Sequence, residues 1–507
     1  MSPALLRAGR LLAAALAGGL HTLAFAPWEL WPLQVLSIAA LVALLQGQGA
    51  RGAAALGVAY ASAWFTSGLW WLYISMHDYG GVPAVLAALA VLLLALFLSL
   101  HLAVALALWA RWRPARPAAA AGGFALVWLA AELARAQAFT GFPWMASGYV
   151  HSSGPLQPWA PWVGVYGLGA LAAWCVAAAV LAWWPAGRAP RAGRRWLVAG
   201  APAALVVGLG QILPQDFTEP AGTLRVSLLQ PSVPQDVKFD PDRIVGNLAA
   251  LSSMLVQAQG QLVVTPESVV PLSLDQLPEG AWEAMTAPFQ APGRAVLVGL
   301  FTGDTEQGFV NSLLGAGAGA SPAGYVYGKR HLLPFGEFVP PGFRWFVEAM
   351  GIPMADQASG RQEAPLAVGG QRVRPLICYE DLFGEDFAGV FLREDAPTLL
   401  ANVSNLAWFG RSMIQEQHLQ FSRLRALEFQ RPLVRATNTG ATGVVDHQGR
   451  WVQALPAWTP GVLEATVTGR TGTTPYAHWL GRLGLWPLWG VVLVGAAVLL
   501  RPGRGQP

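Results

Sequence analysis

The chain is poor in charge, lysine and cysteine, and each shortage excludes a class of protein. Only 12% of its 507 residues are charged, against about 25% in soluble domains, and the mean hydropathy is +0.43. Arginine supplies almost every positive charge, because the sequence has only two lysines. Without lysine-rich tracts, the net charge of +4 does not indicate a nucleic-acid-binding groove. Two cysteines, Cys175 in an apolar run and Cys378 in the polar half, cannot form a disulfide framework.

Several common site motifs are also missing. His331 and His418 lack a second ligand at metal spacing. No glycine-rich phosphate loop follows a strand and opens a helix, and the serine-nucleophile motif Gly-x-Ser-x-Gly is absent from the sequence. We therefore expect a site with no metal and no cofactor.

Long apolar runs fill the first half of the chain and return near its end. A membrane-spanning helix needs about 20 largely apolar residues. The candidate runs, of which the first two are short, are residues 11–26, 32–46, 53–74, 82–110, 117–138, 163–184, 196–213 and 483–500. The sequence thus predicts a polytopic α-helical membrane domain of about eight spans, with seven helices in residues 1–215 and an eighth in residues 482–501. The first run is expected to be retained and not cleaved as a signal peptide, because further spans follow at once.

The arginines indicate how these spans are oriented. They cluster in alternate loops, and the loops at residues 27–31, 75–81 and 139–162 contain no lysine or arginine. Under the positive-inside rule both termini lie in the cytoplasm, and the segment between the seventh and eighth spans lies outside it.

That outer segment has a different pattern. From Thr223 onward acidic residues become frequent, and short β-type runs alternate with helical stretches at about 241–258 and 412–430. The predicted strands are residues 224–230, 262–265, 295–301, 309–314, 373–377, 398–403, 434–437, 442–445 and 461–467. Alternating strands and helices of this kind predict an α/β sheet sandwich over residues 222–470.

Three reactive side chains lie at or near the ends of these strands: Glu267, Lys329 and Cys378. A cysteine thiol has a pKa near 8.5, so it needs a base to act as a nucleophile at neutral pH, and Glu267 is the candidate. Lys329 and the backbone N–H of Tyr379 would stabilise the oxyanion, a contribution of about 3–4 kcal/mol for such donors. Glu337 would hold Lys329 in place or share the proton transfer. Each residue alone has a plain structural explanation, and only the three together indicate covalent acyl chemistry.

Aromatic residues suggest contact with lipid. Trp144 belongs to a group of Trp and Tyr residues in the outer loops, which form either an interfacial belt or an opening for lipid. Between Phe338 and Met354 the chain is rich in apolar residues, including Trp345 and Phe346. We interpret this stretch as a mobile arm that enters the membrane, the alternative being a packed loop. Glu132 and Arg135, within the fifth span, form either a structural ion pair or a lipid-headgroup contact.

Four motifs carry a resemblance to the nitrilase superfamily: Pro266-Glu-Ser268, Tyr327-x-Lys-x-His-Leu-x-Pro-Phe-Gly-Glu337, Ile377-Cys-Tyr-Glu-Asp381 and Ser404-Asn-x-Ala-Trp-Phe-Gly410. With the predicted spans, nearly the whole chain resembles the bacterial apolipoprotein N-acyltransferase family. Two positions depart from the family pattern: Phe239 stands where tryptophan is common, and Leu406 where an acidic residue is common.

The resemblance implies a catalytic triad of Glu267, Lys329 and Cys378 in a four-layer α-β-β-α domain on the periplasmic side of the bacterial inner membrane. Supporting and substrate-lining positions carried over or suggested by position are Glu337, Tyr379, Glu380, Asn311, Trp408, Phe338, Trp345, Phe346 and Trp144. It also implies a ping-pong reaction: a phospholipid acylates Cys378, and the amine of a diacylated apolipoprotein accepts the acyl chain. We expect a monomer. The competing hypotheses are a membrane-tethered amidohydrolase and a non-catalytic membrane scaffold.

Overall fold

The computed structural model describes residues 2–183, 192–304, 306, 308–317, 324–349, 356–360 and 364–500, and for residues 192–198, 346, 347 and 349 the backbone alone. The chain divides into two compact units. The helical unit comprises Met1–Tyr73, Ala84–Gln215 and Leu483–Pro507, and the α/β unit comprises Ile74–Pro83 and Asp216–Arg482. The sequence boundary near residue 215 thus coincides with a boundary between units.

Every apolar run of the sequence corresponds to a helix of the helical unit. These helices are α1 (Pro3–Thr22), α2 (Trp31–Leu44), α3 (Ala50–Leu69), α5 (Ala84–Trp112), α6 (Pro117–Gln137), α7 (Ala160–Trp183), α8 (Ala192–Ile212) and α16 (Trp486–Leu499). Among the described residues four helices are long and apolar enough to cross a membrane, or five if the bent pair α15 (Pro475–Leu483) and α16 is one span. The protein is therefore an integral membrane protein with four or five candidate spans. The total of eight remains a prediction, since α2 and Ala199–Ile212 are shorter apolar helices.

Close backbone contact and buried polar groups hold the helical unit together. A Cβ at Gly18 of α1 would lie 1.9 Å from the carbonyl oxygen of Tyr60, so only glycine permits this approach of α1 to α3. The Tyr60 hydroxyl also bonds the ring of His21 and, at 2.7 Å, the hydroxyl of Ser37 on α2. Hydrogen bonds of this kind join helices where apolar burial gives no net attraction in lipid.

Glu132 and Arg135 of α6 are buried and anchor the loop that follows this helix. Glu132 Oε1 accepts a hydrogen bond from the backbone N–H of Ser147 at 2.6 Å. Arg135 donates to the carbonyl oxygens of Phe142 and, at 2.8 Å, Trp144. Their burial and backbone partners favour the structural interpretation over the headgroup contact.

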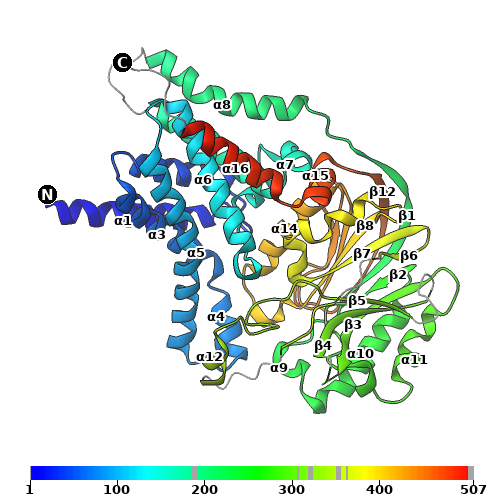
Figure 1. Cartoon of the computed structure of the whole chain (residues 1–507). Helices are drawn as coiled ribbons and strands as arrows, with labels where there is room; N and C mark the ends of the chain where they lie inside the picture. Colours follow the sequence, from blue (N-terminus) through cyan, green and yellow to red (C-terminus); the bar gives the residue numbers. More distant parts are fainter. Residues whose placement is uncertain are drawn as a thin grey trace. The chain divides into compact units, whose positions relative to one another are not determined.

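The α/β unit contains two six-stranded sheets (Figure 1). The first has the order β12 (Gly461–Gly472), β1 (Thr218–Gln230), β2 (Leu262–Val264), β3 (Ala295–Asp304), β4 (Gly308–Gly317) and β5 (Tyr325–Gly328). The second has the order β11 (Trp451–Ala454), β10 (Gly443–Val445), β9 (Leu433–Thr437), β8 (Leu399–Ser404), β7 (Gln371–Ile377) and β6 (Leu366–Val368).

The two sheets share one plan. Strands β1, β2 and β3 are parallel, as are β7, β8 and β9, and each trio continues into two antiparallel strands and is flanked on its other side by one more. Strands β5, β6 and β11 were not predicted from the sequence. They have three or four residues and lie at edges of the two sheets.

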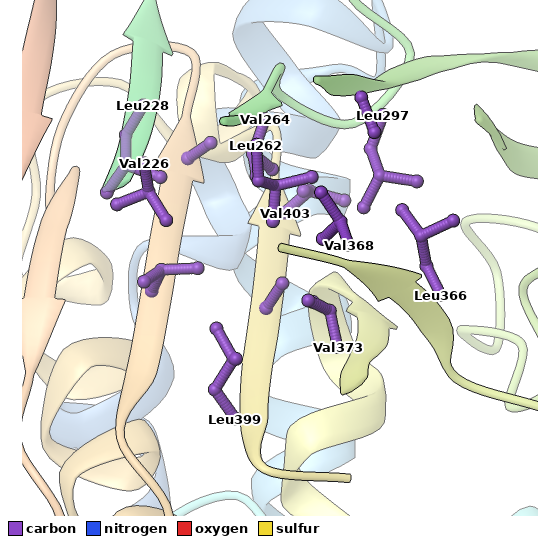
Figure 2. Close-up of a cluster of buried hydrophobic side chains, with 14 of the residues drawn as sticks. Val226, Leu228, Leu262, Val264, Leu297, Leu366, Val368, Val373, Leu399 and Val403 are labelled. Carbon is purple, nitrogen blue, oxygen red and sulfur yellow. The ribbon is translucent and has the colours of Figure 1, made fainter. Parts of the chain in front are cut away.

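Apolar side chains of the two sheets pack against each other (Figure 2). Val226, Leu262 and Leu297 come from the first sheet, and Val373 and Val403 from the second, and all five are fully buried. Because all six parallel strands contribute to one shared core, the carboxyl ends of these strands are held in fixed positions.

Helices cover the outer faces. Helix α10 (Pro241–Gln257) begins at the N-cap Asp240 and buries Leu248, Leu251 and Leu255, a helical spacing, against the first sheet together with α11 (Ala281–Thr286). Helix α14 (Ile414–Phe429) packs on β9 and β10 of the second sheet. Further short helices are α4 (Leu72–Ile74), α9 (Gln235–Lys238), α12 (Arg344–Ala349) and α13 (Gly384–Phe387). The unit is the predicted α-β-β-α sandwich.

Candidate active site

The predicted reactive residues follow three strands of the two sheets. Glu267 comes after β2, Lys329 directly after β5, and Cys378 directly after β7. Loops at the carboxyl ends of parallel strands commonly carry functional groups, because the sheet holds them rigidly while leaving their side chains accessible. Here β2 and β7 belong to different sheets, so the site lies where the two sheets meet.

A buried ion cluster forms the centre of this site. The Lys329 ammonium lies 2.7 Å from Glu337 Oε1 and 3.4 Å from Glu267 Oε1. The side-chain amide of Asn311 donates to the same two oxygens, at 3.2 Å and 2.8 Å respectively. All four side chains are buried, so one ammonium and one amide hold two carboxylates together away from solvent.

Electrostatics keep the central pair ionised. Burial disfavours the charge of Glu267, but Lys329 and the backbone N–H of Asn405, 2.8 Å from Glu267 Oε2, outweigh it and lower the pKa of this carboxyl. Burial also disfavours the charge of Lys329, but Glu337 and Glu267 outweigh it and raise the pKa of this ammonium. Glu267 is therefore a carboxylate at neutral pH.

Cys378 is the partly exposed member of the group, and it packs on the core between the sheets. Burial and the charge of Glu267 raise the pKa of the Cys378 thiol well above its usual value, and Lys329 offsets this only in part. The thiol thus keeps its proton at neutral pH, while the neighbouring carboxylate is free to accept one. This arrangement supports proton removal during attack in preference to a preformed thiolate.

Glu380 links the segments that carry the lysine and the cysteine. Its Oε2 accepts hydrogen bonds from the backbone N–H of Ile377 at 2.6 Å and the hydroxyl of Tyr327 at 2.8 Å. Its Oε1 accepts from the backbone N–H of Arg330 at 2.7 Å. Burial raises the pKa of Glu380 in spite of these donors. The residue joins the end of β7 to the end of β5.

The remaining predicted residues are distributed over both units. The ring of Tyr379 is buried against Phe383 and His331, 5.0 and 5.8 Å away, and the role of its backbone N–H stays a prediction. Trp144 belongs to the helical unit, where it is buried 5.1 Å from the ring of Trp71.

The aromatic lining residues of the α/β unit are partly exposed. Trp408, 37% exposed, lies 6.2 Å from the ring of Phe239 and 6.1 Å from the ring of Tyr79. Phe338 is half-buried, and Trp345 on α12 is 68% exposed. The side chain of Phe346 and residues 350–355 lie outside the described residues.

Sequence reasoning gave Lys238 no role of its own. Its buried ammonium donates to the carbonyl oxygen of Glu267 at 3.3 Å and to the hydroxyl of Ser268 at 2.9 Å. Burial lowers the pKa of Lys238 to about 7, against the opposing effect of Glu267. Both lysines of the chain therefore contact Glu267. The scarcity of lysine was the signal that pointed to Lys329, and it applies equally to Lys238.

Comparisons with known proteins agree with this division. Residues 17–178 match the N-terminal domain of apolipoprotein N-acyltransferase, and residues 225–476 match the carbon-nitrogen hydrolase family. An apolipoprotein N-acyltransferase from Ralstonia nicotianae is 46% identical over 97% of this chain and 93% of its own length. One from Bordetella bronchiseptica is 41% identical over 97% of both chains.

The chain belongs to the apolipoprotein N-acyltransferase family. Among solved structures, a carbon-nitrogen hydrolase superfamily protein from Xanthomonas campestris is 20% identical, with a TM-score of 0.36, over 52% of this chain and 96% of its own. Family membership makes the chain an acyltransferase with a carbon-nitrogen hydrolase domain.

The depressed pKa of Glu267 predicts a pH-dependent contribution to stability. A carboxyl whose pKa is lower in the folded state stabilises the fold above its unfolded pKa of about 4.3, and this contribution is lost as the pH falls through the folded pKa. The difference in melting temperature between the wild type and Glu267→Gln should therefore shrink below about pH 4.3. Thermal unfolding in detergent at pH 7 to pH 3 measures it. Leu297→Ala, an uncharged core variant, is the control and should show a deficit that does not depend on pH; equal behaviour of the two variants would contradict the assignment.

Proposed function

We propose that the protein transfers an acyl chain from a membrane phospholipid, through a thioester on Cys378, to the N-terminal amine of the diacylglyceryl-cysteine of apolipoproteins. The observation that carries the proposal is the partly exposed residue Cys378 beside a buried, ionised Glu267–Lys329 pair. A lipoprotein acceptor and a lipid donor agree with the family. The proposed thioester gives Cys378 of this chain its role in the reaction.

In the first half-reaction Glu267 takes the thiol proton as Cys378 Sγ attacks an ester carbonyl of the phospholipid. The resulting oxyanion is stabilised by Lys329 and the backbone N–H of Tyr379, a type of contact typically worth about 3–4 kcal/mol. Collapse of the intermediate breaks the ester C–O bond, and the leaving lysophospholipid oxygen takes the proton from Glu267. The products are a thioester and a lysophospholipid.

In the second half-reaction the lipoprotein amine attacks the thioester carbonyl. Glu267 accepts a proton from the amine, the C–S bond breaks, and the proton returns to the sulfur of Cys378. An amide and a free thiol result. Glu337 positions Lys329, and Glu380 positions the loops that follow β5 and β7. The lipid substrates exclude water from the site, which favours attack by the amine over hydrolysis of the thioester.

The proposed setting is the bacterial inner membrane. The domain of residues 222–470 lies on the periplasmic side, seven helices of residues 1–215 and an eighth at residues 482–501 form the membrane domain, and the chain acts as a monomer. The support is the alternation of arginine-rich and arginine-free loops together with the apolar helices.

An acyl adduct on Cys378 is the expected product of phospholipid alone. Purified protein incubated with phospholipid in mixed micelles should gain one acyl mass on the Cys378 peptide, and Cys378→Ser should gain none. Peptide mass spectrometry reads the result, and Cys175, buried in the helical unit, is the internal control that stays unmodified. A diacylated lipopeptide should then remove the adduct and become N-acylated. Release of free fatty acid in place of acylated peptide would indicate a hydrolase, and cellular function retained by Cys378→Ser would indicate a scaffold.

Lys238 should contribute to the acid limit of adduct formation, after the larger effect of Lys329 on the pKa of Glu267. Its positive charge is among the groups that lower the pKa of Glu267, so Lys238→Met should raise that pKa and move the acid limb of the pH–rate profile to higher pH. Lys238→Arg retains the charge and should move the limb less. Initial rates of adduct formation between pH 3 and pH 8 provide the measurement; a limb that moves downward in Lys238→Met would refute the electrostatic role.

The aromatic arm should affect the lipid substrate only. Replacing Trp345, which is exposed, and Phe346 with Ser removes two apolar residues of the proposed membrane-entering arm and should slow adduct formation from phospholipid. Alkylation of Cys378 by iodoacetamide, a small water-soluble reagent, should keep its rate. Leu274→Ser, a substitution at another exposed apolar residue of the same unit, is the matched control. Unchanged lipid turnover in the double variant would rule out the arm.

A further inference from the structure

Cys378 has a backbone conformation that the rest of the fold must enforce. Its φ angle is +53°, in the left-handed region that side chains with a Cβ disfavour. A residue keeps such a conformation only when its surroundings hold it there. The direction of the Cys378 side chain depends on this conformation, because rotating the backbone would swing Sγ away from Glu267 and Lys329.

Two buried side-chain donors hold the carbonyl oxygen of Cys378. Asn402 on β8 donates from Nδ2 at 3.1 Å, and His418 on α14 approaches with Nε2 at 3.2 Å. Both side chains are fully buried. The same His418 nitrogen lies 2.9 Å from Asp381 Oδ1, three residues after the cysteine. The turn that carries Cys378 is thus held by side chains of β8 and α14.

Arg435 determines which nitrogen of His418 carries the proton. Its Nη2 lies 3.2 Å from His418 Nδ1, and a guanidinium has donors but no acceptor. Nδ1 therefore accepts, so the proton is on Nε2, where it faces the Cys378 carbonyl and the Asp381 carboxylate. Arg435 also lies 3.6 Å from Asp381 Oδ2, and Ser422 donates to that oxygen. Within this network the positive charge of Arg435 and the negative charge of Asp381 compensate each other.

We infer that His418, oriented by Arg435 and Asp381, is a positioning residue that keeps the backbone of Cys378 in the left-handed conformation required for attack on the lipid ester. The inference rests on the proposed role of Cys378 as the nucleophile. His418 takes no proton from the substrate, because its Nε2–H points at the backbone carbonyl oxygen of Cys378. Its contribution is to the geometry of attack, and it therefore affects the rate of acylation more than the binding of lipid.

Substitutions at His418 and Asn402 test this role. His418→Leu removes the donor, and His418→Gln places an amide Nε2 at a similar reach. Asn402→Ala removes the second donor to the same oxygen without disturbing the charged groups. Arg425→Met is the matched control, because it breaks the buried 2.9 Å ion pair with Glu428 on the same helix without contact to Cys378. For each protein the maximal rate and KM of adduct formation from phospholipid and the melting temperature in detergent are measured.

We expect His418→Leu to lower the maximal rate about tenfold or more with KM within about twofold, as for loss of an aligned geometry. Asn402→Ala should lower it in the same direction, His418→Gln should recover most of the rate, and Arg425→Met should lose stability but keep its rate within about twofold. The inference is overturned if His418→Gln is no faster than His418→Leu, or if the rate loss in His418→Leu is matched by Arg425→Met. If His418→Leu does not fold, Asn402→Ala against Arg425→Met decides. Absence of an adduct in the wild type would instead refute the proposed function.

Discussion

The contact between Lys329 and two carboxylates is the interaction on which the site depends. A buried ammonium without a partner would lose its proton, and a buried pair of carboxylates without a cation could not both stay ionised. Lys329 lies 3.4 Å from Glu267 and 2.7 Å from Glu337, so the attraction between the opposite charges offsets the cost of removing each of them from water. The cluster thereby supplies a carboxylate base and a cation side by side, next to a thiol that keeps its proton until it reacts.

Burial of this cluster has a structural cost that the surrounding polar groups offset. Both carboxylate oxygens of Glu267 accept from a neutral donor: Asn311 Nδ2 on Oε1, which also pairs with Lys329, and the Asn405 N–H on Oε2. Breaking a buried pair by removing one partner is strongly destabilising, because the remaining charge has no solvent. The same buried, paired charges therefore hold the site in one geometry and give it the carboxylate and the cation for the proposed reaction.

The sequence allowed the reactive residues to be predicted better than their supports. Glu267 and Cys378 stood out because each follows a strand-like run, and Lys329 and Cys378 because they belong to rare residue types. The contacts of Lys238 and Asn402 could not be predicted from a local pattern, since their partners lie 29 and 24 positions away in the sequence. His418 lacks a second ligand at metal spacing in the sequence, and its partners in the structure are a carbonyl and a carboxylate of the turn Cys378–Leu382 and a guanidinium on β9. The short strand β5, at the edge of its sheet, was also not predicted.

The repeated plan of the two sheets explains how residues so far apart in sequence come together. Glu267 follows the middle strand of the first parallel trio, and Asn405 follows the middle strand of the second. The Asn405 N–H binds Glu267 Oε2 at 2.8 Å, so the ends of the two middle strands meet directly. Cys378 follows the neighbouring strand of the second trio, and its carbonyl is bound by Asn402 of that same middle strand. Glu267 and Cys378, the proposed base and nucleophile, are thus each tied to β8, and their separation is set by the apolar core between the sheets. A change in that core would move one relative to the other, which makes packing distant from the thiol part of the geometry of the reaction.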